Sequence, residues 1–97
     1  MGKTTAEVDT IARDIIDQSG YGDYFTHRLG HGIGLDAHES PYISQTDSNI
    51  FQEGMAFTIE PGIYIKNEFG IRIEDNIIMT NKGACNMMHM SHDLIIL

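Results

Sequence analysis

Residues 55–80 read MAFTIEPGIYIKNEFGIRIEDNIIMT, and this stretch decides the fold. Its apolar runs have the length and composition of strands, and the Pro61-Gly62 step interrupts the first of them. A turn is expected at residues 67–70, and the residues after it alternate strictly between apolar and charged. The sequence therefore predicts strands at residues 55–59, 63–65, 71–74 and 76–80.

A helix is predicted before these strands, from about residue 5 to residue 19. Thr4 with Glu7 three residues later makes the pattern of a capping box, and Gly20 stands where a helix-terminating glycine belongs. One apolar stripe follows helical spacing, with the charged residues mainly off it. The stripe comprises Val8, Ile11, Ala12, Ile15 and Ile16, and the charged residues are Asp9, Arg13, Asp14 and Asp17.

Residues 21–50 show no helical or strand period, and we predict a shaped loop with a short strand at about residues 24–27. Residues 30–34 hold three glycines in five residues, and three histidines fall within twelve residues, namely His27, His31 and His38. A turn at residues 81–83 and a last strand at residues 93–97 complete the chain. The predicted fold class is α+β, with one N-terminal helix followed by a mainly antiparallel sheet.

Composition narrows the class of protein. The chain has 97 residues, 41% of them apolar and 21% charged, which indicates one ordered domain or part of one. The net charge of −8 argues against a nucleic-acid partner, because phosphate binding needs a basic surface. No run approaches the roughly 20 apolar residues of a membrane helix, and no signal peptide is evident. The single cysteine, Cys85, fits a reducing compartment, so a cytoplasmic protein is predicted.

Alternation along the last predicted strands separates apolar from charged side chains. Ile71 and Ile73 fall on one face, which we expect to contact a core, while Arg72 and Glu74 fall on the other. Glu74 then lies within an otherwise apolar strand, where an ionised carboxylate is costly unless it is paired or binds a ligand. Glu74 is therefore a candidate site residue.

Two further residues are candidate ligands. Glu60 precedes Pro61-Gly62, which can direct its carboxylate away from the sheet. His31 lies between two glycines, which let the backbone approach a neighbour and leave the imidazole uncovered. An imidazole with two carboxylates is a common divalent-metal set, and with further carboxylates it suits Mn, Co, Zn or Fe. Spacing alone does not bring His31, Glu60 and Glu74 together, so separate structural roles and a shared metal site both stay open.

Three segments resemble the motifs of one enzyme family. Residues 27–39, HRLGHGIGLDAHE, resemble the signature of the proline peptidases, which comprise Xaa-Pro dipeptidase (prolidase) and aminopeptidase P. Residues 58–62, TIEPG, and residues 72–76, RIEDN, resemble the two later motifs in the right order. Three ordered motifs in a short chain make the resemblance specific, and it covers nearly the whole chain.

The resemblance implies a fold and a metal site. Residues 1–97 are expected to form the C-terminal part of a pita-bread metallopeptidase catalytic domain, that is, the second half of the fold. His31, Glu60 and Glu74 match the ligands of a two-metal site. In that site Glu74 bridges both ions, and Glu60 also handles the proton of the attacking water. Mn is the expected metal, with Co, Zn or Fe as alternatives.

The resemblance also implies roles toward a proline-containing peptide substrate, whose Xaa-Pro bond would be hydrolysed. His38 matches the histidine that hydrogen-bonds the substrate carbonyl or the tetrahedral oxyanion. His27 matches a substrate-side histidine of the proline-specific branch, and Arg72 matches an arginine that steadies a neighbouring carboxylate.

The family's site also uses two aspartates that come before the opening helix, and residues 1–97 contain no match to them. Asp9, Asp14 and Asp17 lie on the predicted helix itself. We therefore expect a fragment that binds one ion weakly and is inactive or nearly so alone. Because half of a two-half fold exposes core surface, a homodimer is also expected.

Three alternatives remain. Methionine aminopeptidase shares the Gly-His-Gly-Ile-Gly and Glu-Pro motifs, although the lead-in at residues 27–30 favours the proline branch. Creatinase-type enzymes use this fold without metal, and the intact histidine and glutamates argue against that reading. A non-catalytic binding or chaperone module of the same fold is the third alternative, and the intact ligands weigh against it as well.

Overall fold

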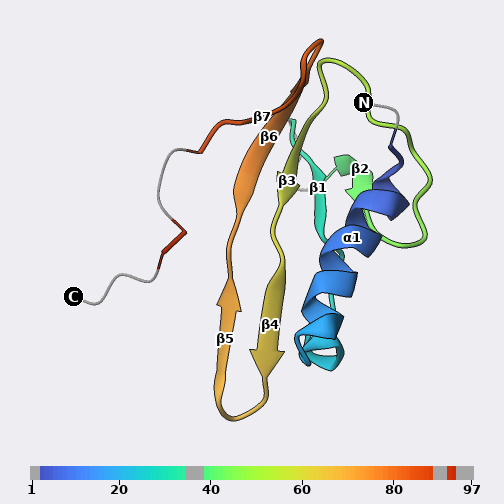
Figure 1. Cartoon of the computed structure of the whole chain (residues 1–97). Helices are drawn as coiled ribbons and strands as arrows, with labels where there is room; N and C mark the ends of the chain where they lie inside the picture. The colour runs from blue at the N-terminus through green and yellow to red at the C-terminus, as the bar shows by residue number, and fades with distance from the viewer. Residues whose placement is uncertain (1–2, 35–38, 89–91, 94–97) are drawn as a thin grey trace.

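The computed structural model describes residues 3–34, 39–88 and 92–93 (Figure 1). One helix and a 3₁₀ turn precede strands that all pair antiparallel, which confirms the predicted α+β class. The elements are α1 (Thr5–Gln18), η1 (Gly22–Tyr24), β1 (Gly30–Gly32), β2 (Glu39–Ile43), β3 (Ala56–Ile59), β4 (Gly62–Ile65), β5 (Phe69–Arg72), β6 (Asp75–Thr80) and β7 (Gly83–Asn86).

The strands form a five-stranded sheet in the order β2-β1-β3-β6-β7 and a two-stranded sheet of β4 and β5. A single bent ribbon runs through both sheets, because β3 continues into β4 and β5 continues into β6 (Figure 1). Ile59 pairs with Asp75 above the bend, and Gly62 pairs with Arg72 below it. Pairing stops between these two rungs, which is where Glu60 and Glu74 lie.

Helix α1 begins and ends as its sequence predicts. The Thr4 hydroxyl accepts a hydrogen bond of 3.2 Å from the Glu7 N–H, which satisfies one of the unpaired donors of the first turn. Gly20 has φ +91°, the left-handed conformation that ends many helices and that glycine adopts without steric cost.

The two faces of α1 differ from the prediction. Val8, Ala12 and Ile16 pack against the core as expected. Ile11 and Ile15, however, are 50% and 62% exposed. Asp9, which was placed among the charged residues off the stripe, is fully buried. The helical period located the stripe correctly, but it could not show which neighbour covers which part of it.

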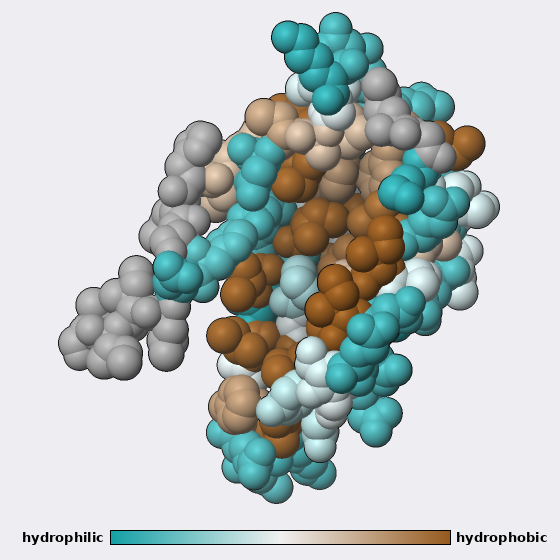
Figure 2. Space-filling view, viewed as in Figure 1, coloured by the Kyte–Doolittle hydropathy of each residue, from teal (hydrophilic) through white to brown (hydrophobic). Residues whose placement is uncertain are grey.

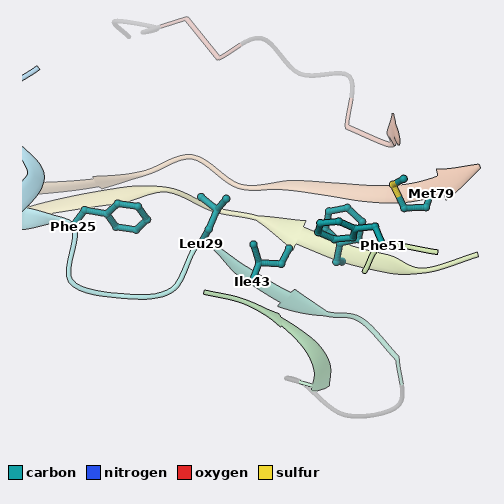
Figure 3. Close-up of a cluster of buried hydrophobic side chains, with 6 residues drawn as sticks. Phe25, Leu29, Ile43, Phe51 and Met79 are labelled. Carbon is teal, nitrogen blue, oxygen red and sulfur yellow. The ribbon is translucent and has the colours of Figure 1, made fainter. Parts of the chain in front are cut away.

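The core is a chain of large side chains from the loops and the central strands (Figure 3). The Phe51 and Phe57 rings lie 4.7 Å apart and join the loop before β3 to the sheet. Burying such a side chain contributes about 1.5–3 kcal/mol each. The cluster comprises Phe25, Leu29, Ile43, Phe51, Phe57 and Met79.

The loop predicted at residues 21–50 contains more regular structure than its sequence indicates. No strand forms at residues 24–27, where the chain leaves η1 in an extended loop. Instead β1 forms on the glycines themselves and pairs with β2 and β3. A Cβ at Gly30 would lie 1.8 Å from the Thr58 carbonyl oxygen, so the glycine is needed for close backbone approach and not for loop flexibility.

Other boundaries also shift. The turn of the lower hairpin comprises residues 66–68, and Phe69 and Gly70 already belong to β5. Ile71 and Ile73 do not reach the main core. They are exposed and share a hollow of 110 Å³ with Ile16 and Ile63. Strand β7, after the predicted turn, was missed, and the last strand predicted at residues 93–97 falls almost wholly outside the described residues.

An apolar groove of 510 Å³ runs between α1 and the sheet, visible as a strip of hydrophobic side chains in Figure 2. It includes the exposed Ile11 and Ile15 of the helix and Phe57, Ile59 and Ile77 of the sheet. Among the described residues, no helix is long and apolar enough to cross a membrane.

The contact at Gly30 gives a stability prediction. Gly30→Ala should destabilise the protein by more than about 3 kcal/mol, because the added methyl meets backbone that cannot move aside without separating β1 from β3. Gly54→Ala is the matched control. It has open space but φ +90°, so it should cost about 1–2 kcal/mol from backbone strain alone. Equal losses in urea unfolding would contradict the close-approach argument.

Candidate functional site

The bend of the ribbon places two glutamates next to each other. Glu60 follows β3, and its N–H donates a 2.8 Å hydrogen bond to the Leu29 carbonyl. Glu74 lies between β5 and β6, beside a 3.2 Å hydrogen bond from the Ile73 N–H to the Pro61 carbonyl. The sequence predicted that Glu74 lies inside a strand, and this was wrong, because Glu74 lies in the break between β5 and β6. Both carboxylates project from interruptions in the ladder.

Strand β1 brings His31 to Glu60. The His31 N–H donates to the Thr58 hydroxyl at 3.1 Å, and the imidazole Nε2 lies 3.5 Å from Glu60 Oε2. The other ring nitrogen, Nδ1, lies 2.9 Å from the Gly32 carbonyl oxygen, which can only accept. Nδ1 therefore carries the proton, and in the neutral ring Nε2 presents its lone pair to the glutamates, the arrangement typical of a metal-binding histidine.

The two carboxylates have opposite pKa shifts. Burial raises the pKa of Glu74, and so does the adjacent Glu60, while His31 and Arg72 oppose the shift. Burial also acts to raise the pKa of Glu60, but hydrogen bonds from Thr58 and Glu74, with the charges of His31 and Arg72, hold it below its ordinary value. A proton is therefore held more readily on Glu74 than on Glu60. A cation between the carboxylates would replace that proton.

Arg72 contacts the carboxylate oxygen of Glu60 that His31 does not. Its NH1 lies 3.4 Å from Glu60 Oε1, and its guanidinium lies 5.5 Å from the centre of the Tyr64 ring. Glu60 is nearly buried, whereas Arg72 is half-exposed. This contact would allow Arg72 to orient the Glu60 carboxylate, and that role stays a prediction.

His27 points into the same region. Its Nδ1 donates to the Arg28 carbonyl at 2.7 Å, and its ring meets the edges of the Phe25 and Tyr64 rings at 4.9 and 5.9 Å between centroids. Nε2 is buried, and none of the described residues hydrogen-bonds to it. A Cβ at Gly62 would lie 3.0 Å from this nitrogen, so glycine is what leaves room beside it.

A pocket of 860 Å³ connects these groups. Its lining includes His27, His31, Glu60 and Arg72 of the predicted site residues. Glu74 joins the group through its hydrogen bond with Glu60. His38 lies outside the described residues, so its predicted role stays a prediction.

The pocket also contains residues that the sequence reasoning did not single out. The Arg28 guanidinium lies 4.4 Å from the centre of the Tyr42 ring, and both residues line the pocket. Thr58 hydrogen-bonds to both His31 and Glu60. Its place on the same strand face as Glu60 was a usable signal, whereas nothing in the spacing of Arg28 and Tyr42 could have joined them.

The donor chemistry fits a divalent cation, although the groups are not gathered around one point. Within residues 3–34, 39–88 and 92–93, no three His, Cys, Asp or Glu side chains lie close enough together to hold an ion. The pairs His31–Glu60 and Glu60–Glu74 are adjacent, and an imidazole with two carboxylates suits Mn, Co, Zn or Fe. His31, Glu60 and Glu74 are thus the residues that could hold a metal.

Comparison with known proteins identifies the family. The model of metallopeptidase family M24 matches residues 1–81, and the chain belongs to this family. The Xaa-Pro dipeptidase of Pyrococcus furiosus is 52% identical over 94 residues, which cover 97% of this chain and 27% of that protein. The resemblance to the proline-specific branch is therefore confirmed.

Solved structures agree on the fold. The prolidase from Pyrococcus furiosus superposes with a TM-score of 0.91 at 53% identity, covering 94% of this chain and 27% of that one. The X-Pro aminopeptidase from Thermotoga maritima gives a TM-score of 0.93 at 40% identity, covering 99% of this chain and 27% of that one. The pita-bread prediction is confirmed. The chain spans about a quarter of the length of these relatives.

The carboxylate pair predicts a pH-dependent effect of Glu74→Gln on the metal-free protein. Since the pKa of Glu74 is raised on folding, its ionised form opposes folding, and this cost appears as the pH rises through the raised pKa. The substitution should stabilise the metal-free protein at neutral pH by less than about 1 kcal/mol, because solvent screens the exposed side chain. Below the ordinary value of 4.5 the gain should vanish.

Thermal unfolding across pH, with Glu68→Gln in the exposed hairpin turn as control, measures this effect. The same Glu74→Gln substitution should weaken Mn²⁺ binding at least about tenfold, because a metal ligand is lost. A loss of stability at neutral pH would contradict the raised pKa of Glu74.

Proposed function

We propose that the whole protein hydrolyses Xaa-Pro peptide bonds with the help of divalent metal ions, as an Xaa-Pro dipeptidase or an aminopeptidase P. The observation that carries the proposal is the contact of His31 with Glu60, on a fold shared with relatives named Xaa-Pro dipeptidase and prolidase. His27 and Arg72 line the same pocket, which is large enough for a short peptide.

His31, Glu60 and Glu74 would hold the metal, the histidine through Nε2 and the glutamates through their carboxylates. A bound divalent ion would supply Lewis acidity at the scissile carbonyl and a water that ionises near neutral pH. Two ions, with Mn as the expected metal, remain our proposal for the complete site, and Glu74 would be one of the residues that hold them.

The remaining residues act on the substrate and on protons. Glu60 is held ionised by Thr58, Glu74, His31 and Arg72, which suits it to accept the proton of the attacking water. Arg72 fixes the orientation of that carboxylate from Oε1. His27 would accept a hydrogen bond from the substrate at Nε2, because its other nitrogen is already engaged with the Arg28 carbonyl. His38 stays the proposed donor to the developing oxyanion.

Residues 1–97 alone supply three of the proposed ligands, so we propose that this chain binds one ion weakly and has little or no activity by itself. The apolar groove beside α1 supports this view, because a groove lined by Ile11, Ile15, Phe57 and Ile77 exposes surface that a larger domain would bury. For the isolated chain the same surface makes a homodimer the expected state. A cytoplasmic location also stays a prediction.

The activity of the full-length protein tests the proposal. With Mn²⁺ it should hydrolyse Ala-Pro, lose this activity in chelator, and regain it when Mn²⁺ is restored. Glu60→Gln should lower kcat/KM by about 10²- to 10⁴-fold through loss of the proton acceptor, whereas Glu53→Gln, an exposed glutamate, should leave it unchanged.

The substrate profile separates the alternatives. Cleavage of Ala-Pro without Ala-Pro-Ala indicates a dipeptidase, and cleavage of both indicates aminopeptidase P. Release of methionine from Met-Ala without any cleavage before proline would favour the methionine aminopeptidase alternative and overturn the proposal. Absence of all three activities in the metal-loaded protein would favour a non-catalytic module.

Calorimetric titration of the purified 97-residue chain with Mn²⁺ tests its partial ligand set. We expect weak binding of one ion at most, abolished in His31→Ala, because the proposed ligand set in this chain has three side chains, His31, Glu60 and Glu74. Tight binding of two ions, lost in the same variant, would show that the chain assembles a complete site.

A further inference from the structure

An ion pair on α1, between a buried aspartate and a partly buried arginine, lies outside the proposed metal site. Asp9 is fully buried, and Arg13 one turn later contacts both of its carboxylate oxygens, with Nε at 2.9 Å from Oδ1 and NH2 at 3.2 Å from Oδ2. The two-point contact fixes the plane of the guanidinium. Its outer N–H groups therefore point in defined directions, away from the helix.

The outer N–H groups of Arg13 reach the loop that precedes β1. Arg13 NH1 donates to the Phe25 carbonyl at 2.8 Å, and NH2 donates to the His27 carbonyl at 2.9 Å. The Asp9 carboxylate accepts a hydrogen bond of 3.1 Å from the Leu29 N–H. One ion pair thus holds three backbone groups within residues 25–29, a segment without helix or strand structure of its own.

The segment held in this way carries His27. Its carbonyl is bound by Arg13, and its ring packs edge-on against Phe25 at 4.9 Å between centroids. The guanidinium of Arg13 in turn lies 4.1 Å from the centre of the Phe25 ring. Arg13 therefore constrains the backbone of His27 directly and its ring through Phe25.

The network also reaches the backbone of Glu60 in the proposed metal site. The Leu29 N–H is shared between Asp9 and the Ile43 carbonyl, and the Leu29 carbonyl accepts from the Glu60 N–H at 2.8 Å. His27, with its buried Nε2, precedes Arg28, and Leu29 follows it. The ion pair therefore binds the backbone on both sides of Arg28, through the His27 carbonyl and the Leu29 N–H.

We propose that Asp9 and Arg13 are positioning residues that set the orientation of the His27 ring in the substrate pocket, an inference that rests on the proposed function. Stability alone is a weak reason for this pair, because buried ion pairs often stabilise no more than apolar residues of the same volume. The fixed geometry of the pair instead holds the backbone of residues 25–29 in one position. Lysine cannot replace the arginine, since one ammonium cannot reach the carboxylate and both carbonyls in the same fixed plane.

Arg13→Lys in the full-length protein tests this role, with Asp14→Asn on the exposed side of α1 as control. We expect kcat/KM for Ala-Pro to fall by about 10²-fold in Arg13→Lys, the size of loss that a small misplacement of a site residue produces. The control should keep the activity of the parent protein.

A double-mutant cycle with His27→Ala separates positioning from general structural support. If Arg13 acts through His27, Arg13→Lys should change kcat/KM by less than about twofold once His27 is already absent. If Arg13→Lys fails to give cooperative thermal unfolding, Asp9→Asn, which keeps the shape of the side chain, takes its place in the cycle. Full additivity of the two losses would overturn the inference.

A readout without catalysis completes the test. Nitrogen-15 spectra of histidine-labelled, metal-free protein should show His27 protonated at Nδ1, and Arg13→Lys should shift or broaden these signals while Asp14→Asn leaves them unchanged. Unchanged His27 signals in Arg13→Lys would overturn the inference even if activity falls. A parent protein that hydrolyses Ala-Pro while Arg13→Lys keeps full activity refutes the positioning role alone, whereas a parent inactive on Xaa-Pro bonds refutes the proposed function and the inference together.

Discussion

The close approach of β1 to β3 is the contact on which the rest of the site depends. A backbone carbonyl of Thr58 occupies the space where any side chain at Gly30 would stand. This approach lets the His31 N–H reach the Thr58 hydroxyl and the Glu60 N–H reach the Leu29 carbonyl. The imidazole and the carboxylate consequently face each other at 3.5 Å, although their residues are far apart in the sequence. Gly30 permits this approach because it has no side-chain atoms to hold the two strands apart.

The bent ribbon imposes a second constraint, which has an energetic cost. Interruptions in the two strands place Glu60 and Glu74 side by side, which raises the pKa of Glu74 while the pKa of Glu60 is held below its ordinary value. A protein selected for stability alone would not bring two acids together in this way. Strained or repulsive groups are typical of functional sites, where a ligand offsets their cost. Arg72 reduces the repulsion, and so does His31 when its ring is positively charged.

Helix α1 connects these two constraints to the outside of the molecule. Its buried face contributes apolar side chains to the core and an ion pair to the loop that carries His27. Its other apolar residues, Ile11 and Ile15, line a groove that the described residues leave open. The helix thus supports the site on one side and presents an uncovered apolar surface on the other.

The sequence by itself determined the helix with its caps, the approximate positions of β3, β4, β5 and β6, and the choice of candidate ligands, because capping, alternation and short motifs are local properties. It missed β1 and β2, whose pairing joins segments apart in the chain, and it missed β7. It placed Asp9 off the apolar stripe and did not predict its burial, because a helical period cannot identify what covers a given face. Tertiary structure decided that Glu60 and Glu74 share a bend, that His31 faces Glu60, and that Arg13 reaches the loop of His27. Each of these relations joins segments whose distance in space is set by packing and hydrogen bonding across the sheet, and not by their separation along the chain.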